Sequence, residues 1–232
     1  MKLIEVNSVS KQFGHVKALD DVNFHVEKGE SFGLVGESGS GKTTLARIIL
    51  KLITASEGEI VYEGGFSRKD YQIVFQNPWT SLNPRMKIKA ILKEPLDIHG
   101  VKKDVVQLLR DVELDESYLG KFPHELSGGE RQRIGIARAI SIEPKFIVLD
   151  EPVSSLDMTV QVGVLKLLKD LRSRLNLTLL FIAHDLSVIR YMCDRVAVMR
   201  SGNIVETGSV TEVYKDPQHS YTKLLLESIP KL

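Results

Sequence analysis

Residues 36–44 read GESGSGKTT and combine the residue types that hold a phosphate group. The three glycines allow backbone angles that other residues avoid, so successive N–H groups can point inward around a phosphate at a helix N-terminus. A lysine adds positive charge near the β- and γ-phosphates, and the threonine after it can join a Mg²⁺ shell. An apolar run before the loop and a helix-like run after it favour this interpretation over a glycine-rich turn with an exposed lysine. The predicted phosphate-binding residues are Gly36, Ser38, Gly39, Ser40, Gly41, Lys42, Thr43 and Thr44.

Two acids follow the apolar run at residues 146–149, which is typical of a buried parallel strand whose carboxyl end faces a site. Asp150 can hold Mg²⁺ directly or through water, and Glu151 can take the proton of an attacking water. The alternative is a pair of solvated acids that open a turn before Pro152. The presence of a phosphate loop in the same chain favours the functional interpretation.

Two further patterns each allow two interpretations. His184 ends the apolar run 178–183, where a histidine could hydrogen-bond a γ-phosphate, although an isolated histidine often has no such role. Ser127 is a candidate helix N-cap, and the backbone N–H groups of Gly128 and Gly129 would make a second anion site. An ordinary capped helix start explains the same residues.

Two aromatic side chains also leave the choice open. Phe13 lies ahead of a predicted sheet, where it could stack on a nucleotide base or belong to the core. Trp79, the only tryptophan, lies in a loop at residues 77–84 whose two prolines disfavour a helix. It is either an anchor for a partner protein or a lid over the core.

The composition restricts the class of protein. A formal charge of +1 over 232 residues lacks the basic excess of a dedicated nucleic-acid binder. The single cysteine, Cys193, rules out an internal disulfide and is typical of a reducing compartment, where it would be a small core residue. No apolar run approaches the ~20 residues of a membrane span, and the N-terminus lacks a signal-peptide pattern. We therefore expect a cytosolic protein with one or two domains.

Hydrophobic periodicity predicts short strands around a helical insertion. The segment from Lys87 to Gly120 has helical spacing, a further helix runs from about Arg131 to Ile142, and an amphipathic helix follows Asp157. Phe13 falls in a loop between the first strands, and two short helices flank Pro217 near the end. The predicted strands cover residues 3–6, 22–26, 31–35, 58–62, 71–75, 146–149, 178–183, 196–199 and 204–206.

The motifs occur in the order GESGSGKT, Gln76, LSGGE, FIVLDE, SSLD and His184. With this order and spacing, the chain resembles the ATP-binding subunit of ABC transporters over nearly its whole length. VFQNPWTSLNPRM at residues 74–86 and DPQHSYTKLLLESIP at 216–230 are similar to the oligopeptide, dipeptide and nickel importers of that family. The turn at residues 63–70 is shorter than in that subfamily, and the chain ends at Leu232, before the longer tail of many members.

The resemblance implies an α/β fold, with a P-loop NTPase core built on a mainly parallel sheet, an N-terminal antiparallel β-subdomain and an inserted α-helical subdomain. Residues 1–232 would form one ATP-binding domain, with 1–82 and 142–232 as the catalytic core and 83–141 as the helical subdomain. This subdomain carries the signature pentapeptide LSGGE at residues 126–130. ATP and Mg²⁺ are the implied cofactors. The implied catalytic residues are Gln76, Glu151 and His184, the further nucleotide contacts are Phe13, Ser127, Gly128, Gly129 and Asp157, and the Mg²⁺ contacts are Thr43, Gln76 and Asp150.

The implied function is ATP hydrolysis that powers the import of di- or oligopeptides. Alternatives are the import of nickel or another small solute, a non-transport ABC ATPase, and a nucleotide-binding regulator without turnover, which Glu151 disfavours. The implied partners are a second ATP-binding subunit, identical or homologous, two transmembrane permease subunits and, indirectly, a solute-binding protein, but no nucleic acid. The protein would then lie peripherally on the inner face of the cell membrane.

Overall fold

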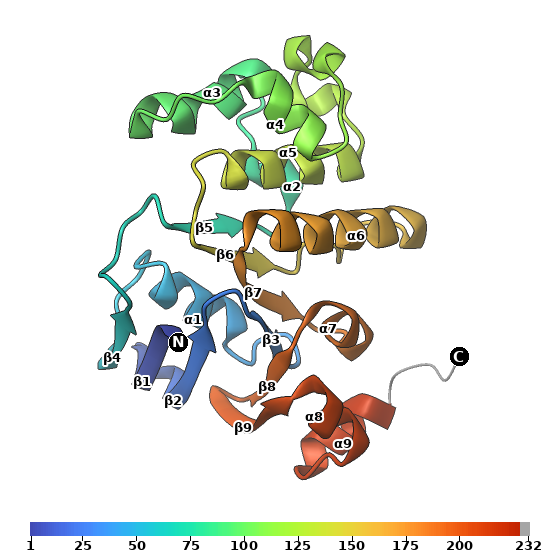
Figure 1. Ribbon diagram of the computed structural model, residues 1–232. Coiled ribbons are helices and arrows are strands. Elements are labelled where there is room, and N and C mark those ends of the chain that lie inside the picture. The colour runs from blue at the N-terminus through green and yellow to red at the C-terminus, as the bar shows by residue number, and fades with distance from the viewer. Residues whose placement is uncertain (228–232) are drawn as a thin grey trace. The chain divides into compact units, whose positions relative to one another are not determined.

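The computed structural model describes residues 1–227, which form two compact units (Figure 1). The first unit consists of the described residues of Met1–Phe66 and Thr178–Leu232, and the second of Ser67–Leu177. The predicted tail motif extends to residue 230, so its last three residues lie outside the described residues.

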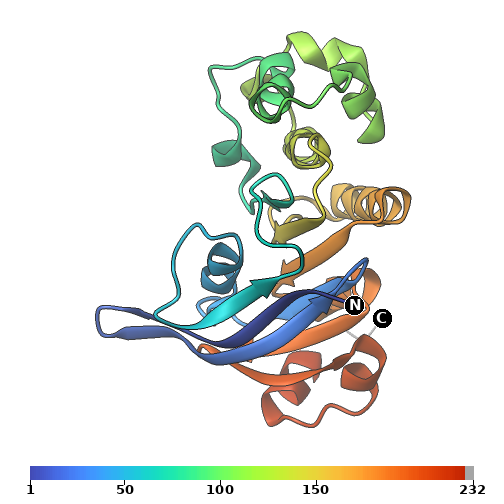
Figure 2. The same cartoon turned by 60° about the vertical axis from the view of Figure 1, so that its left-hand side comes forward.

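An antiparallel sheet at the N-terminus belongs to the first unit. Its strands are β1 (Lys2–Phe13), β2 (Val16–Glu27) and β4 (Glu57–Tyr62), in the order β2-β1-β4. β1 and β2 are longer than the sequence predicts. They form the long hairpin drawn in blue in Figure 2, whose tip is at the left of the view. The alternation of side chains is broken where Ser8 and Asp21 take φ values of +50° and +49°. The Asn23 side chain accepts the N–H of Ser8 and donates to the carbonyl of Asp21, so it bridges the two irregular positions. Because these positions interrupt the alternation, the full length of the strands cannot be recognised in the sequence.

The parallel strands of the first unit carry the phosphate loop. β3 (Ser31–Val35) lies between β7 (Thr178–Ala183) and β8 (Arg195–Arg200), parallel to both. Every residue of β3 and β7 is buried, as their unbroken apolar runs predict. β9 (Asn203–Ser209) pairs antiparallel with β8. The helices of this unit are α1 (Lys42–Ile49), α7 (Leu186–Met192), α8 (Val210–Lys215) and α9 (Ser220–Glu227).

The second unit consists of two parallel strands and a set of helices. β5 (Tyr71–Val74) pairs with β6 (Phe146–Asp150). Leu96, Leu108 and Ile142 form one of its apolar clusters, with Val101 and Val105 packed against it. The helices are α2 (Pro78–Ser81), α3 (Ile88–His99), α4 (Val105–Asp111), α5 (Gly128–Ile140) and α6 (Met158–Leu175), with 3₁₀ turns η1 (Glu116–Gly120) and η2 (Pro123–Glu125).

Two local predictions need correction. The segment after Gln76 is not a helix-free loop, because α2 begins at Pro78. Proline is tolerated in the first turn of a helix, where its missing N–H would have no partner, and Asn77 caps the turn by accepting the N–H of Trp79. α5 begins at Gly128, three residues before the start predicted at about Arg131, while the predicted N-cap at Ser127 is confirmed.

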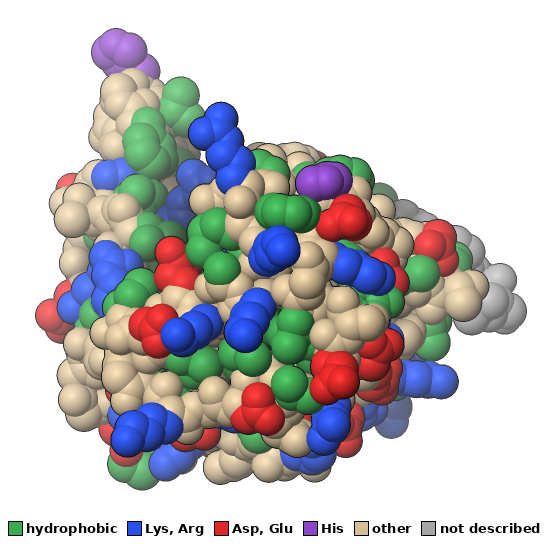
Figure 3. Space-filling view, turned by 90° about the horizontal axis from the view of Figure 1, so that it is seen from above, with side chains coloured by type: hydrophobic (Ala, Val, Ile, Leu, Met, Phe, Trp, Pro, Cys, Tyr) green, Lys and Arg blue, Asp and Glu red, His purple; other side chains and the backbone are tan. Residues whose placement is uncertain are grey.

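The face of the molecule seen in Figure 3 carries both signs of charge, with Lys and Arg side chains interspersed among Asp, Glu and apolar side chains. Among residues 1–227 no helix has the length and apolarity needed to cross a membrane.

Candidate functional site

The loop between β3 and α1 can hold a phosphate group. Its last residue, Gly41, is the N-cap of α1 with φ +108°, and no side chain caps this helix or places an acid in its first turn. A Cβ on Gly41 would lie 2.6 Å from the carbonyl oxygen of Ala18, so the position admits only glycine. The N-terminus of α1 therefore offers its backbone dipoles to a bound anion.

Lys42 supplies the positive charge of this loop. Its side chain is 5% exposed, and Nζ donates hydrogen bonds to the carbonyl oxygens of Gly36 and Glu37, each at 2.7 Å. A Cβ on Gly36 would lie 2.1 Å from the Met199 carbonyl oxygen, so the loop leaves β3 against the end of β8. The ammonium group is thus held within the loop, and the chemistry of this donor set fits a polyphosphate.

His184 lies at the same sheet edge as the phosphate loop. Val35, the last residue of β3, pairs with Ala183, the last residue of β7, so each strand ends one residue before a predicted site residue. His184 is exposed there. The predicted nearness to the phosphate site follows from this register.

Phe13 lies near the tip of the β1–β2 hairpin and is 50% exposed. The ammonium of Lys11 lies 4.9 Å from the centre of its ring. The core interpretation of Phe13 is therefore wrong, and its ring has a face that a planar ligand can reach.

The acids predicted to do the hydrolytic chemistry lie in the second unit, at the end of β6. Asp150 is 5% exposed, and the Glu151 carboxylate accepts a hydrogen bond from Gln76 Nε2 at 2.9 Å. Gln76 follows β5, whose Val74 pairs with Leu149 of β6, so the parallel register brings the two side chains together. Glu151 has φ +47°, and Ser154 bonds its carbonyl through both N–H and Oγ. A glutamate with positive φ costs on the order of 1–2 kcal/mol, and such strain concentrates at functional sites.

The SGGE segment is both a capped helix start and a close helix contact. Ser127 and Glu130 form a capping box, in which Glu130 Oε2 accepts from the N–H and hydroxyl of Ser127 at 2.7 and 2.8 Å. A Cβ on Gly129 would lie 2.4 Å from Val160 of α6. Asp157 caps α6 by accepting the N–H of Val160. The N-termini of α5 and α6 therefore lie together, with the signature residues and Asp157 at one place.

Trp79 is 62% exposed, which excludes the core interpretation. The Arg131 guanidinium lies 3.1 Å from the centre of its ring. Arg131 is itself 2% exposed, and it donates hydrogen bonds to the carbonyls of Pro123 and His124. The tryptophan is thus held against the signature helix, with most of its ring in solvent.

Some of the site's supporting residues were not predicted. Tyr118 of η1 donates its hydroxyl hydrogen bond to Glu130 Oε1 at 2.5 Å, and Arg131 packs on Trp79. Tyr221 of α9 accepts the N–H of Glu37 in the phosphate loop at 3.0 Å. Each contact joins segments distant in sequence. A cue existed only for Tyr221, which lies within the recognised tail motif.

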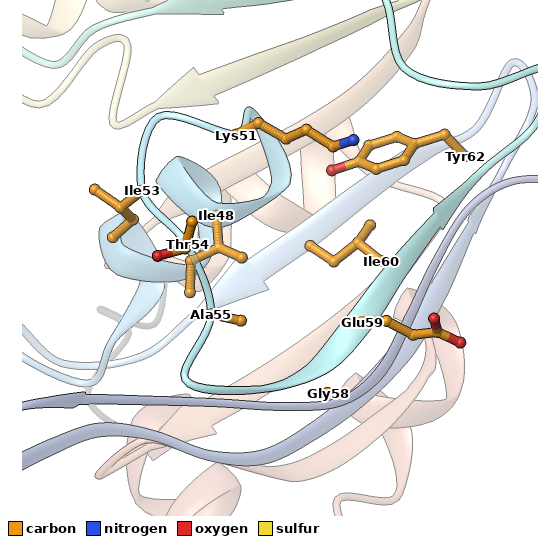
Figure 4. A pocket seen from close by; sticks show the side chains of 9 residues that line it. All are labelled: Ile48, Lys51, Ile53, Thr54, Ala55, Gly58, Glu59, Ile60 and Tyr62. Atoms are coloured by element: carbon orange, nitrogen blue, oxygen red, sulfur yellow. The ribbon is translucent and has the colours of Figure 1, made fainter.

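A separate pocket of about 290 Å³ lies between the end of α1 and β4 (Figure 4). Ile48, Ile53 and Ile60 line it with Lys51 and Tyr62. None of its lining residues is a predicted site residue.

The comparisons with known proteins identify the family. Residues 19–154 match the family described as ABC transporter. The chain is also 49% identical to the oligopeptide transport ATP-binding protein OppF of Streptococcus mutans, over 99% of this chain and 82% of that protein. The chain belongs to the ABC transporter family. Membership confirms the predicted family and its ATPase class.

Other relatives of this ABC ATPase agree. It is 46% identical to the dipeptide transport ATP-binding protein DppF of Lactococcus lactis subsp. cremoris, over 99% of this chain and 81% of that protein. Its fold matches the ATP-binding cassette MJ0796, solved as a dimer in a post-hydrolysis state with ADP and Pi, at a TM-score of 0.77 and 27% identity over 89% of this chain and 98% of that one. It also matches cbiO1 of Clostridium perfringens at a TM-score of 0.82 and 26% identity, over 93% and 91%. The predicted α/β fold class is confirmed.

Proposed function

We propose that this ABC ATPase hydrolyses ATP to power the import of di- or oligopeptides. The observation that carries the hydrolytic part is the 2.9 Å hydrogen bond from Gln76 to Glu151, which holds a carboxylate beside Asp150 at the end of β6. The peptide substrate is supported by the relatives that match 99% of the chain, which are oligopeptide and dipeptide transport proteins.

ATP would bind with its β- and γ-phosphates at the N-terminus of α1 and with Lys42 beside them. Phe13, exposed near the hairpin tip, would stack on the adenine, a contact worth ~1–3 kcal/mol by analogy with base stacking. A bound Mg²⁺ would neutralise phosphate charge, with Thr43, Gln76 and Asp150 as its protein contacts. Hydroxyl, amide and carboxylate oxygens are the donors that this ion prefers.

Hydrolysis would proceed by attack of water on the γ-phosphorus as the bond to ADP breaks. Glu151 would accept the water's proton, and Gln76 would keep the carboxylate oriented through their hydrogen bond. His184 would donate a hydrogen bond to the γ-phosphate. A general base of this kind contributes about 10²–10⁴-fold to the rate.

Each ATP would be shared between two subunits. One subunit would hold it in the phosphate loop, while the partner would offer Ser127, Gly128 and Gly129 to the γ-phosphate and Asp157 across the interface. Support comes from the two helix N-termini that meet at Gly129 and Val160, and from the dimeric solved structure of MJ0796. The partner subunit is an identical or a homologous chain.

The membrane side of the transporter would be reached through Trp79. Its exposed ring rests on Arg131 of the signature helix, so a permease helix that packs on it would also contact the segment that faces the partner's ATP. The subunit would therefore lie on the inner face of the membrane, bound to two permease subunits and served by a solute-binding protein.

Sedimentation of Glu151→Gln with and without Mg-ATP tests the shared site, because ATP that is bound and not consumed should favour the dimer by mass action. We expect a dimer with Mg-ATP and a monomer without it. Two controls separate the steps when each is combined with Glu151→Gln: Ser127→Arg should bind ATP and stay monomeric, while Lys42→Ala should lose ATP affinity. Full specific activity of the wild-type chain in a species that is monomeric at every dilution would refute the shared site. Inactivity without dimerisation would point to a different ATPase partner.

The transported solute needs a separate assay. We expect hydrolysis by the complex with its permease subunits in vesicles to rise when the solute-binding protein is loaded with a di- or oligopeptide. Stimulation by Ni²⁺ and not by peptides would assign the chain to the alternative importer class.

A further inference from the structure

The C-terminal helix α9 contacts the phosphate loop through one side chain. Tyr221 is 2% exposed, and its hydroxyl oxygen accepts the N–H of Glu37 at 3.0 Å. The Tyr221 hydroxyl, with an ordinary pKa of 10, is neutral at pH 7, and burial raises this pKa further. The bond therefore joins a neutral side chain to the first peptide of the loop.

The same peptide group also accepts a hydrogen bond from the phosphate-binding lysine, Lys42. The N–H of Glu37 and the carbonyl of Gly36 belong to the same planar peptide group, and the carbonyl accepts from Lys42 Nζ at 2.7 Å. Tyr221 thus holds one side of the peptide, and the lysine holds the other. Because hydrogen bonds at the two ends of a peptide polarise one another, each strengthens the other.

Residues of β8, β9 and the turn before α9 fix the position of Tyr221. Glu206 of β9 accepts the N–H groups of Gln218 and His219 at 2.8 and 3.0 Å, which fixes the turn before α9. The His219 ring accepts the N–H of Tyr221 at 3.1 Å, and the Arg200 guanidinium lies 4.9 Å from the tyrosine ring centre. The position of the hydroxyl is therefore set by several independent contacts.

We propose that Tyr221 is a positioning residue for ATP binding, which acts through the Gly36–Glu37 peptide on Lys42. Tyr221 lies in the tail motif, outside the phosphate loop and outside the predicted nucleotide and Mg²⁺ contacts, and its bond makes the tail helix part of the nucleotide site. Of the proposed function, this inference requires only ATP binding. A different membrane partner or transported solute would not affect it.

Removal of the hydroxyl in Tyr221→Phe tests this directly. The affinity for ATP should fall by about 3- to 10-fold, the loss expected for one hydrogen bond. Without the hydroxyl, the loop of the free enzyme is less well ordered, and ordering it on ATP binding costs free energy. This cost is the same in the ground-state complex and in the transition state, so KM should rise by the same factor while kcat stays unchanged. Calorimetry with a non-hydrolysable ATP analogue measures the affinity of the full chain, and steady-state hydrolysis separates KM from kcat.

Tyr62→Phe is the matched control. Tyr62 is also a buried tyrosine of the first unit, and its hydroxyl donates to the carbonyl of Ile49 at 2.7 Å, at the far end of α1 from the loop. The Tyr62→Phe variant lacks a comparable hydrogen bond, so it should have a lower free energy of unfolding and an unchanged affinity for ATP. An equal loss of affinity in both variants would reduce the effect to general destabilisation and overturn the proposal.

Two other outcomes would also overturn it. One is an unchanged KM in a folded Tyr221→Phe variant. If that variant does not fold, hydrogen exchange of the wild-type protein without nucleotide decides, because the Glu37 amide should exchange more slowly than the exposed amides of the loop. Exchange at the rate of an exposed amide would show that the tyrosine does not hold the peptide.

Discussion

Loss of the Tyr118 hydroxyl should weaken the signature segment in a way that depends on pH. The hydroxyl donates to Glu130 Oε1, while Glu130 Oε2 holds the N–H and hydroxyl of Ser127. The bond to Tyr118 is the largest influence on Glu130 and lowers the pKa of that carboxyl, while the carboxylate raises the pKa of Tyr118 to about 12. Tyr118→Phe removes this donor and leaves the ring in place.

The size of the effect follows from the exposure of the pair. A hydrogen bond to a charged group contributes about 1.5–3 kcal/mol when it is buried. Both side chains are half-buried here, so water replaces part of the interaction and about 1 kcal/mol remains. For a chain of this size that corresponds to a fall in Tm of roughly 2–4 °C.

The sign of the pH dependence follows from the lowered pKa of Glu130. A carboxyl with a lower pKa in the folded state stabilises the protein above its unfolded pKa of about 4.5, and this contribution is lost as the pH falls through the folded value. The difference in Tm between wild type and Tyr118→Phe should therefore be full at pH 7 and shrink below pH 4.5. Thermal unfolding across this range measures it.

A double-mutant cycle supplies the control. Glu130→Gln keeps an acceptor but removes the charge, and the double variant with Tyr118→Phe isolates the coupling between the two side chains. A difference in Tm that stays constant from pH 7 to pH 4, or single effects that simply add, would refute the charge-assisted bond.

Three further predictions concern the site. Glu151→Gln should bind ATP normally and lose at least about 10²-fold in kcat, because an amide cannot accept the proton; a kcat above a tenth of wild type would contradict the role. Gly129→Ala should lower the free energy of unfolding by about 1–3 kcal/mol, because its Cβ would lie 2.4 Å from Val160. Gly135→Ala in the same helix is the control: no atom lies near its Cβ, so it should be neutral or stabilising. Equal effects of the two variants in denaturant unfolding would refute the packing argument. Trp79→Ala should lower binding to vesicles that carry the permease subunits and leave isolated hydrolysis nearly unchanged; a markedly lower Tm with normal vesicle binding would instead indicate a structural role.

Much of the fold could be predicted because its signals are local. Buried parallel strands produce unbroken apolar runs, and β3, β6 and β7 were found at or within one residue of their ends for that reason. Other elements were missed where a local exception intervenes. The bulges at Ser8 and Asp21 break the alternation of β1 and β2.

The residues of the candidate site likewise fall into those that local signals predict and those that they do not. Gly41 is required by its own φ and by the Ala18 carbonyl, and the motif around it already encodes that requirement. The contacts of Tyr118 and Tyr221 are not encoded in this way, because the tail motif includes Tyr221 but does not indicate its partner, and Tyr118 lies in no motif. A tyrosine hydroxyl suits many partners, and only the folded chain decides that one meets Glu130 and the other the Glu37 amide. Prediction therefore ends where function depends on which distant segments are brought together.

The capping box of α5 explains how a signature segment can be stable before it meets a partner. The Ser127 hydroxyl donates to Glu130 and accepts the N–H of the same residue, so its hydrogen-bonding capacity is met within the chain. Were it left unsatisfied and later buried, the cost would be about 1–3 kcal/mol. A phosphate from a second subunit would therefore exchange one satisfied hydrogen bond for another, and the Glu130 carboxylate beside it would repel the incoming charge. In the proposed dimer, Glu130 would therefore limit how tightly the two subunits hold ATP, and so would favour reopening after hydrolysis.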